Sequence, residues 1–122
     1  MKRDMELIRK MLLALESEEP SEVAWKDVHE NYATEQYNYH SHWLIEAGLV
    51  KGVTITDGQD MPDGAIMLHL TWSGCDFLDS IRDASIWEKT KANLLKPGAS
   101  MTFALVKEYA THLVKQKLGM TD

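Results

Sequence analysis

The fold is decided by residues 34–56, which read TEQYNYHSHWLIEAGLVKGVTIT. Thr34 can cap a helix because its hydroxyl accepts a backbone N–H two or three residues later, and Glu35 suits the positive first turn. Gly48 suits the left-handed position just past a last helical turn. We therefore expect a helix from Thr34 to Gly48 and an extended segment from Leu49. The buried stripe expected on this helix is Tyr37, Ser41, Leu44 and Ala47.

A β-hairpin is predicted directly after this helix. Two runs suited to strands, residues 49–56 and 65–70, flank residues 57–64. The flanked segment reads DGQDMPDG, which is dense in residues that favour turns. The hairpin should therefore have a long tip.

The segment before residue 34 predicts one clear helix and one short strand. Residues 4–16 carry apolar side chains at spacings of three and four, the pattern of an amphipathic helix. These side chains are Met5, Ile8, Met11, Leu12 and Leu15. Pro20 and the carboxylates of residues 16–21 end this helix in an acidic turn. Residues 23–28 then predict a strand, although their apolar and polar residues alternate poorly.

Three further helices are expected after the hairpin. Thr71 or Ser73 caps the first, which runs through Phe77, Leu78 and Ile81. Ser85 opens the second, which reaches Leu94–Leu95 before the breaking segment 96–100. The last helix runs from about Ser100 to Leu118 and is closed by Gly119. Its expected buried stripe is Leu105, Tyr109, His112 and Leu113.

Two short motifs resemble parts of bacterial winged-helix repressors. HSHWLIEAGLV, residues 40–50, resembles the signature H-x-x-x-L-x-x-A-G-L-V that ends the recognition helix of the arsenic-sensor type. LTWSGCDFL, residues 70–78, is similar to the opening of the helix after the wing in the phenolic-acid-repressor type. These resemblances imply a helix-rich α+β fold: a winged-helix-like domain with a β-hairpin wing and extra C-terminal helices.

A resemblance over most of the chain is to a family of small proteins of unknown function common in prophages and bacterial chromosomes. It rests on MKRDMELIR at residues 1–9, the EAGL block, and the segment from Thr71 to Asp83 with Trp87. This resemblance implies a winged-helix-like fold and a mobile-element context, and nothing about a substrate. The chain departs from the winged-helix pattern in residues 17–33, which look too short and acidic for the usual supporting helix.

Length and composition fit one domain in a reducing compartment. The 122 residues are 44% apolar, enough for one hydrophobic core. We expect a single domain, 1–122, with a winged-helix core in residues 1–83 and a helical extension in residues 84–122. Cys75 is the only cysteine, so no disulfide can form within the chain, and the cytoplasm is the expected location. No apolar run approaches the roughly 18 residues that span a bilayer.

The net charge of −6 argues against a generic polyanion binder. Residues 1–86 hold seven basic and sixteen acidic side chains, a net charge of −9. Residues 87–122 hold six basic and three acidic side chains, a net charge of +3. Any polyanion-binding surface would therefore lie in the C-terminal part rather than in the N-terminal part.

The winged-helix resemblance implies duplex DNA as one partner. Polar side chains of the second predicted helix would then enter the major groove, with a hairpin lysine at the DNA backbone. They are Gln36, Asn38, Tyr39 and His42, with Lys51 on the hairpin. No Lys or Arg lies between Lys26 and Lys51, although such residues normally neutralise phosphates. The alternative is a solvated polar face.

A host or phage protein is the second partner to consider. Trp43 and Ile45 fall off the expected core stripe, and large apolar groups suit protein interfaces. The last helix is a further candidate surface, for a partner or a homodimer, through Lys107, Lys115 and Lys117. In each case the alternative is packing within the chain itself.

Metal, cofactor and enzyme chemistry find no support in the sequence. His40 and His42 are two residues apart, which places them on diverging sides of a helix. Residues 57–64 lack the ligand pattern of a calcium loop, and no phosphate-binding glycine loop or catalytic triad can be assembled. A DNA-binding regulator and an acidic protein-interaction module therefore both stay open. The resemblance favours the first and the charge favours the second.

Overall fold

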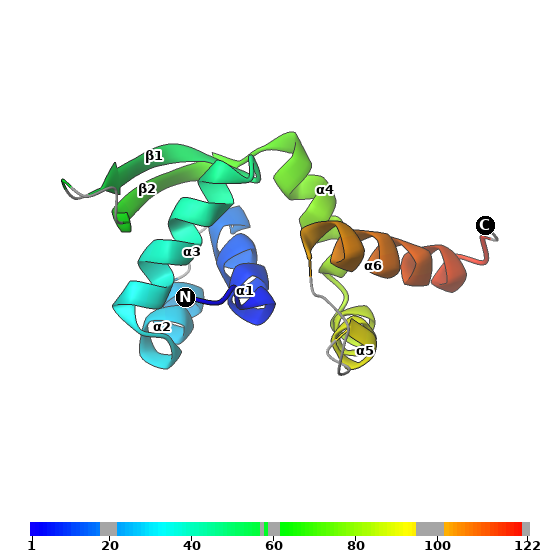
Figure 1. Ribbon diagram of the computed structural model, residues 1–122. Helices are drawn as coiled ribbons and strands as arrows, with labels where there is room; N and C mark the ends of the chain where they lie inside the picture. Colours follow the sequence, from blue (N-terminus) through cyan, green and yellow to red (C-terminus); the bar gives the residue numbers. More distant parts are fainter. Residues whose placement is uncertain (18–21, 57, 59–61, 95–101, 121–122) are drawn as a thin grey trace. The chain divides into compact units, whose positions relative to one another are not determined.

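The computed structural model describes residues 1–17, 22–56, 58, 62–94 and 102–120 (Figure 1). The chain divides into two compact units, Met1–Cys75 (unit 1) and Asp76–Asp122 (unit 2). The described elements are three helices, a two-stranded antiparallel hairpin and three further helices. The predicted helix-rich α+β fold class is therefore confirmed. The expected turn at residues 16–21 and the break at residues 96–100 lie largely or wholly outside the described residues.

Helix α1 (Met5–Glu16) forms where its periodicity predicted it. The Asp4 side chain caps it by accepting the backbone N–H groups of Glu6 and Leu7, at 3.0 and 3.1 Å. Its apolar stripe is buried in unit 1, and Leu15 at the margin of the stripe is half-buried.

Helix α2 (Glu22–Asn31) replaces the expected strand, so that prediction was wrong. Its apolar side chains follow helical spacing, from half-buried Trp25 to Val28, which is buried. The Lys10 ammonium lies 3.0 Å from the Asp27 carboxylate and ties α1 to α2. This helix fills the region in which we expected no supporting helix, so unit 1 has a winged-helix-like order of elements.

Helix α3 (Thr34–Glu46) forms as predicted but begins differently. Ala33 is the N-cap and Thr34 the first helical residue, because the Gln36 side-chain oxygen accepts the Ala33 N–H at 3.2 Å. Gly48 follows the helix with φ of +77°, as expected of its closing glycine. Of the predicted stripe, Ser41 and Leu44 are buried, Tyr37 is half-buried and Ala47 is exposed; His40 is buried in addition.

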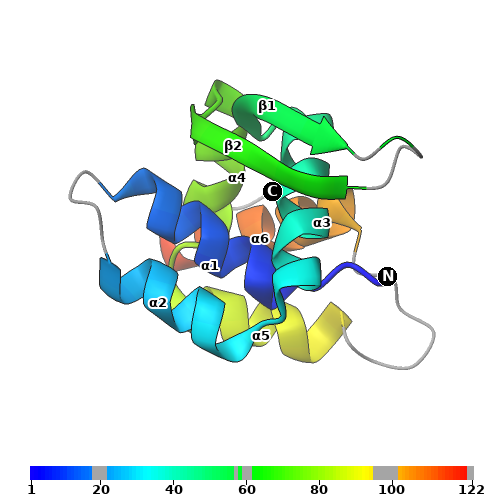
Figure 2. The same cartoon turned by 90° about the vertical axis from the view of Figure 1, so that its left-hand side faces the viewer.

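Strands β1 (Val50–Thr56) and β2 (Pro62–Leu70) form the predicted hairpin. They are antiparallel, and Val53 is paired with Ile66. The register shifts between Lys51 and Gly52 and again between Ile55 and Thr56. One face of the hairpin packs on α1 and α3, and both views show these helices on the same side of it (Figures 1 and 2).

Helices α4 (Trp72–Ile81) and α5 (Ala84–Leu94) begin at side-chain caps. The Thr71 hydroxyl accepts the Gly74 N–H at 3.0 Å, as predicted. Asp83, and not Ser85, caps α5, because its carboxylate accepts the N–H groups of Ser85 and Ile86 at 2.9 and 3.1 Å.

Helix α6 (Phe103–Lys117) buries a different stripe from the predicted one. The buried residues are Val106 and Ala110, whereas Leu105 and His112 are exposed. Thr102 caps the helix, which brings the Phe103 ring to 4.6 Å from the Phe77 ring, between centroids. The buried residues therefore follow Leu105 and Tyr109 by one position each, on the side of α6 that packs in unit 2 against α5. The predicted glycine stop is confirmed, since Gly119 has φ of +76°.

Candidate functional site

The polar side chains predicted to read DNA all lie on α3, and contacts within unit 1 cover part of their surface. Gln36, Asn38, Tyr39 and His42 are all half-buried. Gln36 is engaged at the start of the helix, as described above. The His42 ring nitrogen Nδ1 lies 3.9 Å from a carboxylate oxygen of Glu46.

The larger apolar side chains of α3 are also partly covered. Trp43 is half-buried and contacts two rings of its own helix, with centroids 5.6 Å from Tyr39 and 5.2 Å from His40. Ile45 reaches the hairpin, where its terminal methyl lies 3.0 Å from the position that a Cβ on Gly52 would occupy. These contacts place Ile45 under β1.

His40 fastens α3 to the start of α1 from inside unit 1. Its Nε2 accepts the Asp4 backbone N–H at 2.8 Å, and its Nδ1 lies 2.7 Å from the Gln36 carbonyl oxygen. The neutral ring with its proton on Nδ1 satisfies both bonds. Burial lowers the pKa of His40, which favours this neutral form.

The outer face of the hairpin, opposite the helices, carries four exposed aliphatic side chains. Val53 is 59% exposed and Ile55 47% exposed on β1, while Ile66 is 56% exposed and Leu68 60% exposed on β2. Val53 and Ile66 are register partners and therefore lie side by side. We call these four residues the hairpin patch.

Gly52 explains why the patch faces outward. A Cβ at this position would collide with the Ile66 carbonyl oxygen and crowd Ile45, so only glycine fits on the inner face here. Alternation then places Val53 and Ile55 outside. A slip of one residue would turn them inward and push a side chain into the space that Gly52 keeps free.

Charged residues mark the two ends of the same hairpin. Lys51 shares the outer side of β1 with Val53 and pairs in register with His69, and both are exposed. Asp63 is exposed at the tip end of β2. Among the described residues, neither Lys51 nor Asp63 has an ion-pair partner.

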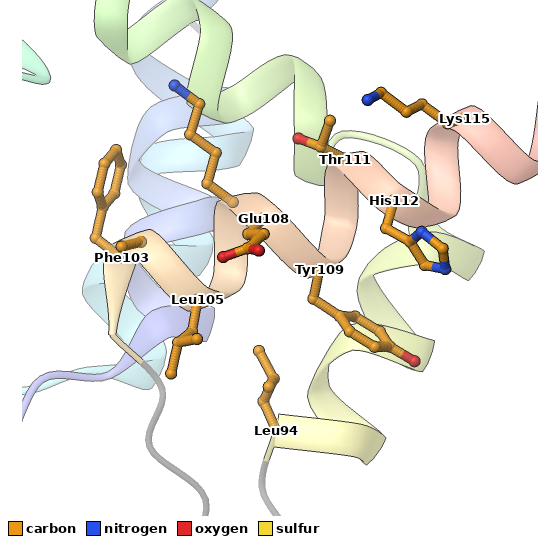
Figure 3. A pocket seen from close by; sticks show the side chains of 10 residues that line it. Leu94, Phe103, Leu105, Glu108, Tyr109, Thr111, His112 and Lys115 are labelled. Carbon is orange, nitrogen blue, oxygen red and sulfur yellow. The ribbon is translucent and has the colours of Figure 1, made fainter. Parts of the chain in front are cut away.

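The three α6 lysines predicted to form an interface do not share one site in unit 2. Lys107 and Lys115 line a pocket between Leu94 and one side of α6, which Figure 3 shows with Tyr109 beside it. Lys117 instead donates to the Asp83 carboxylate at 2.6 Å. That bond lowers the pKa of Asp83 well below its usual range.

The described part of the chain provides neither a metal site nor a membrane-spanning helix. No group of three or more His, Cys, Asp or Glu side chains is placed to hold a metal ion there. None of the described helices combines the length and apolarity needed to cross a membrane.

Comparison with known proteins gives a family. Residues 2–100 match the hypothetical proteins of DUF2513. The chain belongs to the DUF2513 family. An uncharacterised protein of Haemophilus influenzae is 29% identical over 120 residues, which cover 98% of this chain and 100% of that protein. No solved structure matches the chain significantly.

The hairpin patch of this DUF2513 protein was not singled out by sequence reasoning. The run VKGVTIT alternates between two sets of residues, and neither set is plainly the buried one. The signal was Gly52, because a glycine inside a strand often marks a close approach of another backbone. Assigning its side of β1 to the interior would have placed Val53 and Ile55 outside.

Proposed function

We propose that this DUF2513 protein is a protein-interaction module that docks through the hairpin patch. The observation that carries the proposal is a solvent-facing sheet surface made of Val53, Ile55, Ile66 and Leu68. Scattered exposed apolar residues are ordinary, but an adjoining group on one face is typical of a surface that a partner covers. We expect the partner to be another protein, which can be a host or phage protein or a further copy of this chain.

The charge of unit 1 supports a protein partner over nucleic acid. Residues 1–75 contain six basic and thirteen acidic side chains. The exposed charged residues of α3 are Glu35 and Glu46, which repel phosphate groups. An aliphatic surface on an acidic unit suits a partner that presents an apolar centre.

Affinity capture with three forms of the full chain tests this proposal. The bait is the wild type, the double variant Val53→Thr/Ile66→Thr, and the control Val23→Thr. Val23 is 80% exposed on α2, outside the patch, so it matches the chemical change in another place. Threonine keeps the β-branched shape that strands favour.

We expect a partner, identified by mass spectrometry after nuclease treatment, to bind the wild type and the Val23 control but not the double variant. Equal recovery by all three forms would contradict docking through the patch. Loss of every partner on nuclease treatment would contradict a protein-interaction function.

A DNA-binding transcriptional regulator is the second candidate function. It is favoured by the winged-helix-like order of unit 1, which places Asn38 and His42 on the helix before the wing and Lys51 on the wing. Binding to random duplex DNA at about 50 mM salt, where phosphate contacts are strongest, tests it without knowledge of an operator. Salt-sensitive binding that Asn38→Ala/His42→Ala abolishes in a folded chain would replace our proposal.

A further inference from the structure

We propose that the occupant of the hairpin patch is a second copy of this chain, with the two hairpins stacked face to face and running in opposite directions. This inference rests on the proposed function, since it names the partner of the same surface. It also moves the homodimer contact from the α6 lysines expected from the sequence to the hairpin.

The first argument is that unit 1 cannot cover the patch by itself. The close approach of Gly52 to Ile66 and Ile45 fixes which side of β1 faces α3. Val53 and Ile55 are therefore held outside by the same packing that seats the hairpin. Cover must come from another surface.

The second argument is the shape of the patch. Two strands present a short pleated surface with one aliphatic side chain beside another, as at Val53 and Ile66. Two such surfaces can interdigitate as stacked sheets do, about 10 Å apart. An identical hairpin offers this surface without any further element.

The third argument is the charge at the two ends of the hairpin. Lys51 lies at the base and Asp63 near the tip, on either side of the aliphatic residues. A two-fold axis between the sheets, running across the strands, places the base of one hairpin over the tip of the other. The base, which carries Lys51 and His69, then lies over the end that carries Asp63 of the second copy, twice in the dimer.

The other stacking, with the axis along the strands, is less favourable. It brings Lys51 of one copy near Lys51 of the second copy, and Asp63 near Asp63 of the second copy. Like charges then lie close together at both ends of the stack. The whole-chain charge of −6 repels in both arrangements, and salt at about 0.15 M screens that repulsion beyond about 8 Å. The end charges therefore select the antiparallel stack.

Sedimentation equilibrium of the purified full chain at about 0.15 M salt tests the dimer. Because the patch is small, we expect reversible dimers with a dissociation constant in the micromolar to submillimolar range. Val53→Thr/Ile66→Thr should raise that constant at least about tenfold, and Val23→Thr should leave it unchanged. Circular dichroism checks that each variant is folded.

A charge exchange tests the antiparallel alignment. Lys51→Asp alone and Asp63→Lys alone each create like-charge contacts and should weaken the dimer at least about threefold. The double exchange Lys51→Asp/Asp63→Lys should restore wild-type association. No recovery in the double exchange would overturn the alignment.

The dimer and the proposed function can fail separately. A chain that stays monomeric at every concentration, while patch-dependent capture of another protein persists, overturns the second copy as occupant and leaves the proposed function standing. A monomeric chain that also captures the same proteins with and without the patch overturns both.

Discussion

The outer face of the hairpin and the outward side of α3 are neighbouring surfaces of unit 1, yet they expose opposite kinds of side chain. On α3, the side chains that the winged-helix resemblance favours are polar and half-buried. On the hairpin, Lys51 and His69 are exposed at the base, and the hairpin patch that lies between them and the tip is aliphatic.

This difference shows that packing, and not position in a motif, decides which surface is open. Gln36 caps its own helix, and Tyr39 lies against Trp43. The outer face of the hairpin points away from the helices and leaves Val53 and Ile66 exposed. A sequence that resembles a recognition-helix motif can therefore lie on a helix whose polar side chains partly pack within their own unit.

The largest difference in stability is expected between a truncation on α3 and a truncation in the hairpin patch. Leu44 is 2% exposed on α3, so Leu44→Ala should lower the free energy of unfolding of unit 1 by about 2–5 kcal/mol. Ile66→Ala on the exposed face should lower it by less than about 1 kcal/mol. Urea unfolding followed by circular dichroism measures both. Equal losses would mean that the hairpin patch is already covered within the monomer.

The seating of the hairpin on α3 can be broken at Gly52. Gly52→Ala places a methyl group against the Ile66 carbonyl, and we expect a loss of about 1–3 kcal/mol in the same measurement. Gly58→Ala is the matched control, because a Cβ there meets no atom within 4 Å. A neutral Gly52→Ala would show that β1 does not need its close approach to the Ile66 backbone of β2.

The inner anchor of α3 should respond to pH through His40. Its pKa is lowered in the folded state, so the unfolded chain takes up the proton first, from about pH 6.5 downward. The free energy of unfolding should therefore fall as pH drops from 7 to 5, by at most about 1.4 kcal/mol per pH unit.

Two variants of α3 isolate that effect. His40→Gln should flatten the dependence of stability on pH, since glutamine can replace both hydrogen bonds without titrating. His42→Gln makes the same substitution at a half-buried position of the same helix outside the Asp4 contact, and it should keep the dependence that we assign to His40. An identical pH profile in the wild type and His40→Gln would rule out His40 as the titrating group.

The smallest effect is expected at the start of α1, beside the His40 bond. Asp4→Ala removes the carboxylate that accepts two helix N–H groups and should cost about 1 kcal/mol. Asp4→Asn keeps an acceptor and should cost little. If both variants lose the same stability, the charge and not the cap accounts for it.

Sequence reasoning performed best where one local feature fixes one local structure. The α1 stripe, the glycine stop at Gly48, the hairpin and the Thr71 cap are such features, and the structure has them all. It was wrong about residues 23–28, because this short run alternates poorly and the buried side of α2 depends on packing against α1.

The α6 stripe shows the same limit. Leu105 and Tyr109 are better apolar candidates than Ala110, and the buried side is selected by packing against α5 and by the contact between Phe77 and Phe103. The candidate site was also beyond local reasoning. The four aliphatic residues can be read from the sequence. Which face of β1 is buried, however, depends on the contacts of Gly52 with Ile66 and with Ile45 of α3.

The sequence by itself determined the helix-rich α+β class, the hairpin after α3 and the acidic charge of the N-terminal part, because periodicity, turn residues and charge act over a few neighbouring residues. The tertiary structure alone decided which sides of those elements are covered. Burial depends on contacts between residues far apart in the chain, such as Ile45 with Gly52 and Asp4 with His40. Those contacts leave the polar side of α3 half-buried and the aliphatic face of the hairpin open.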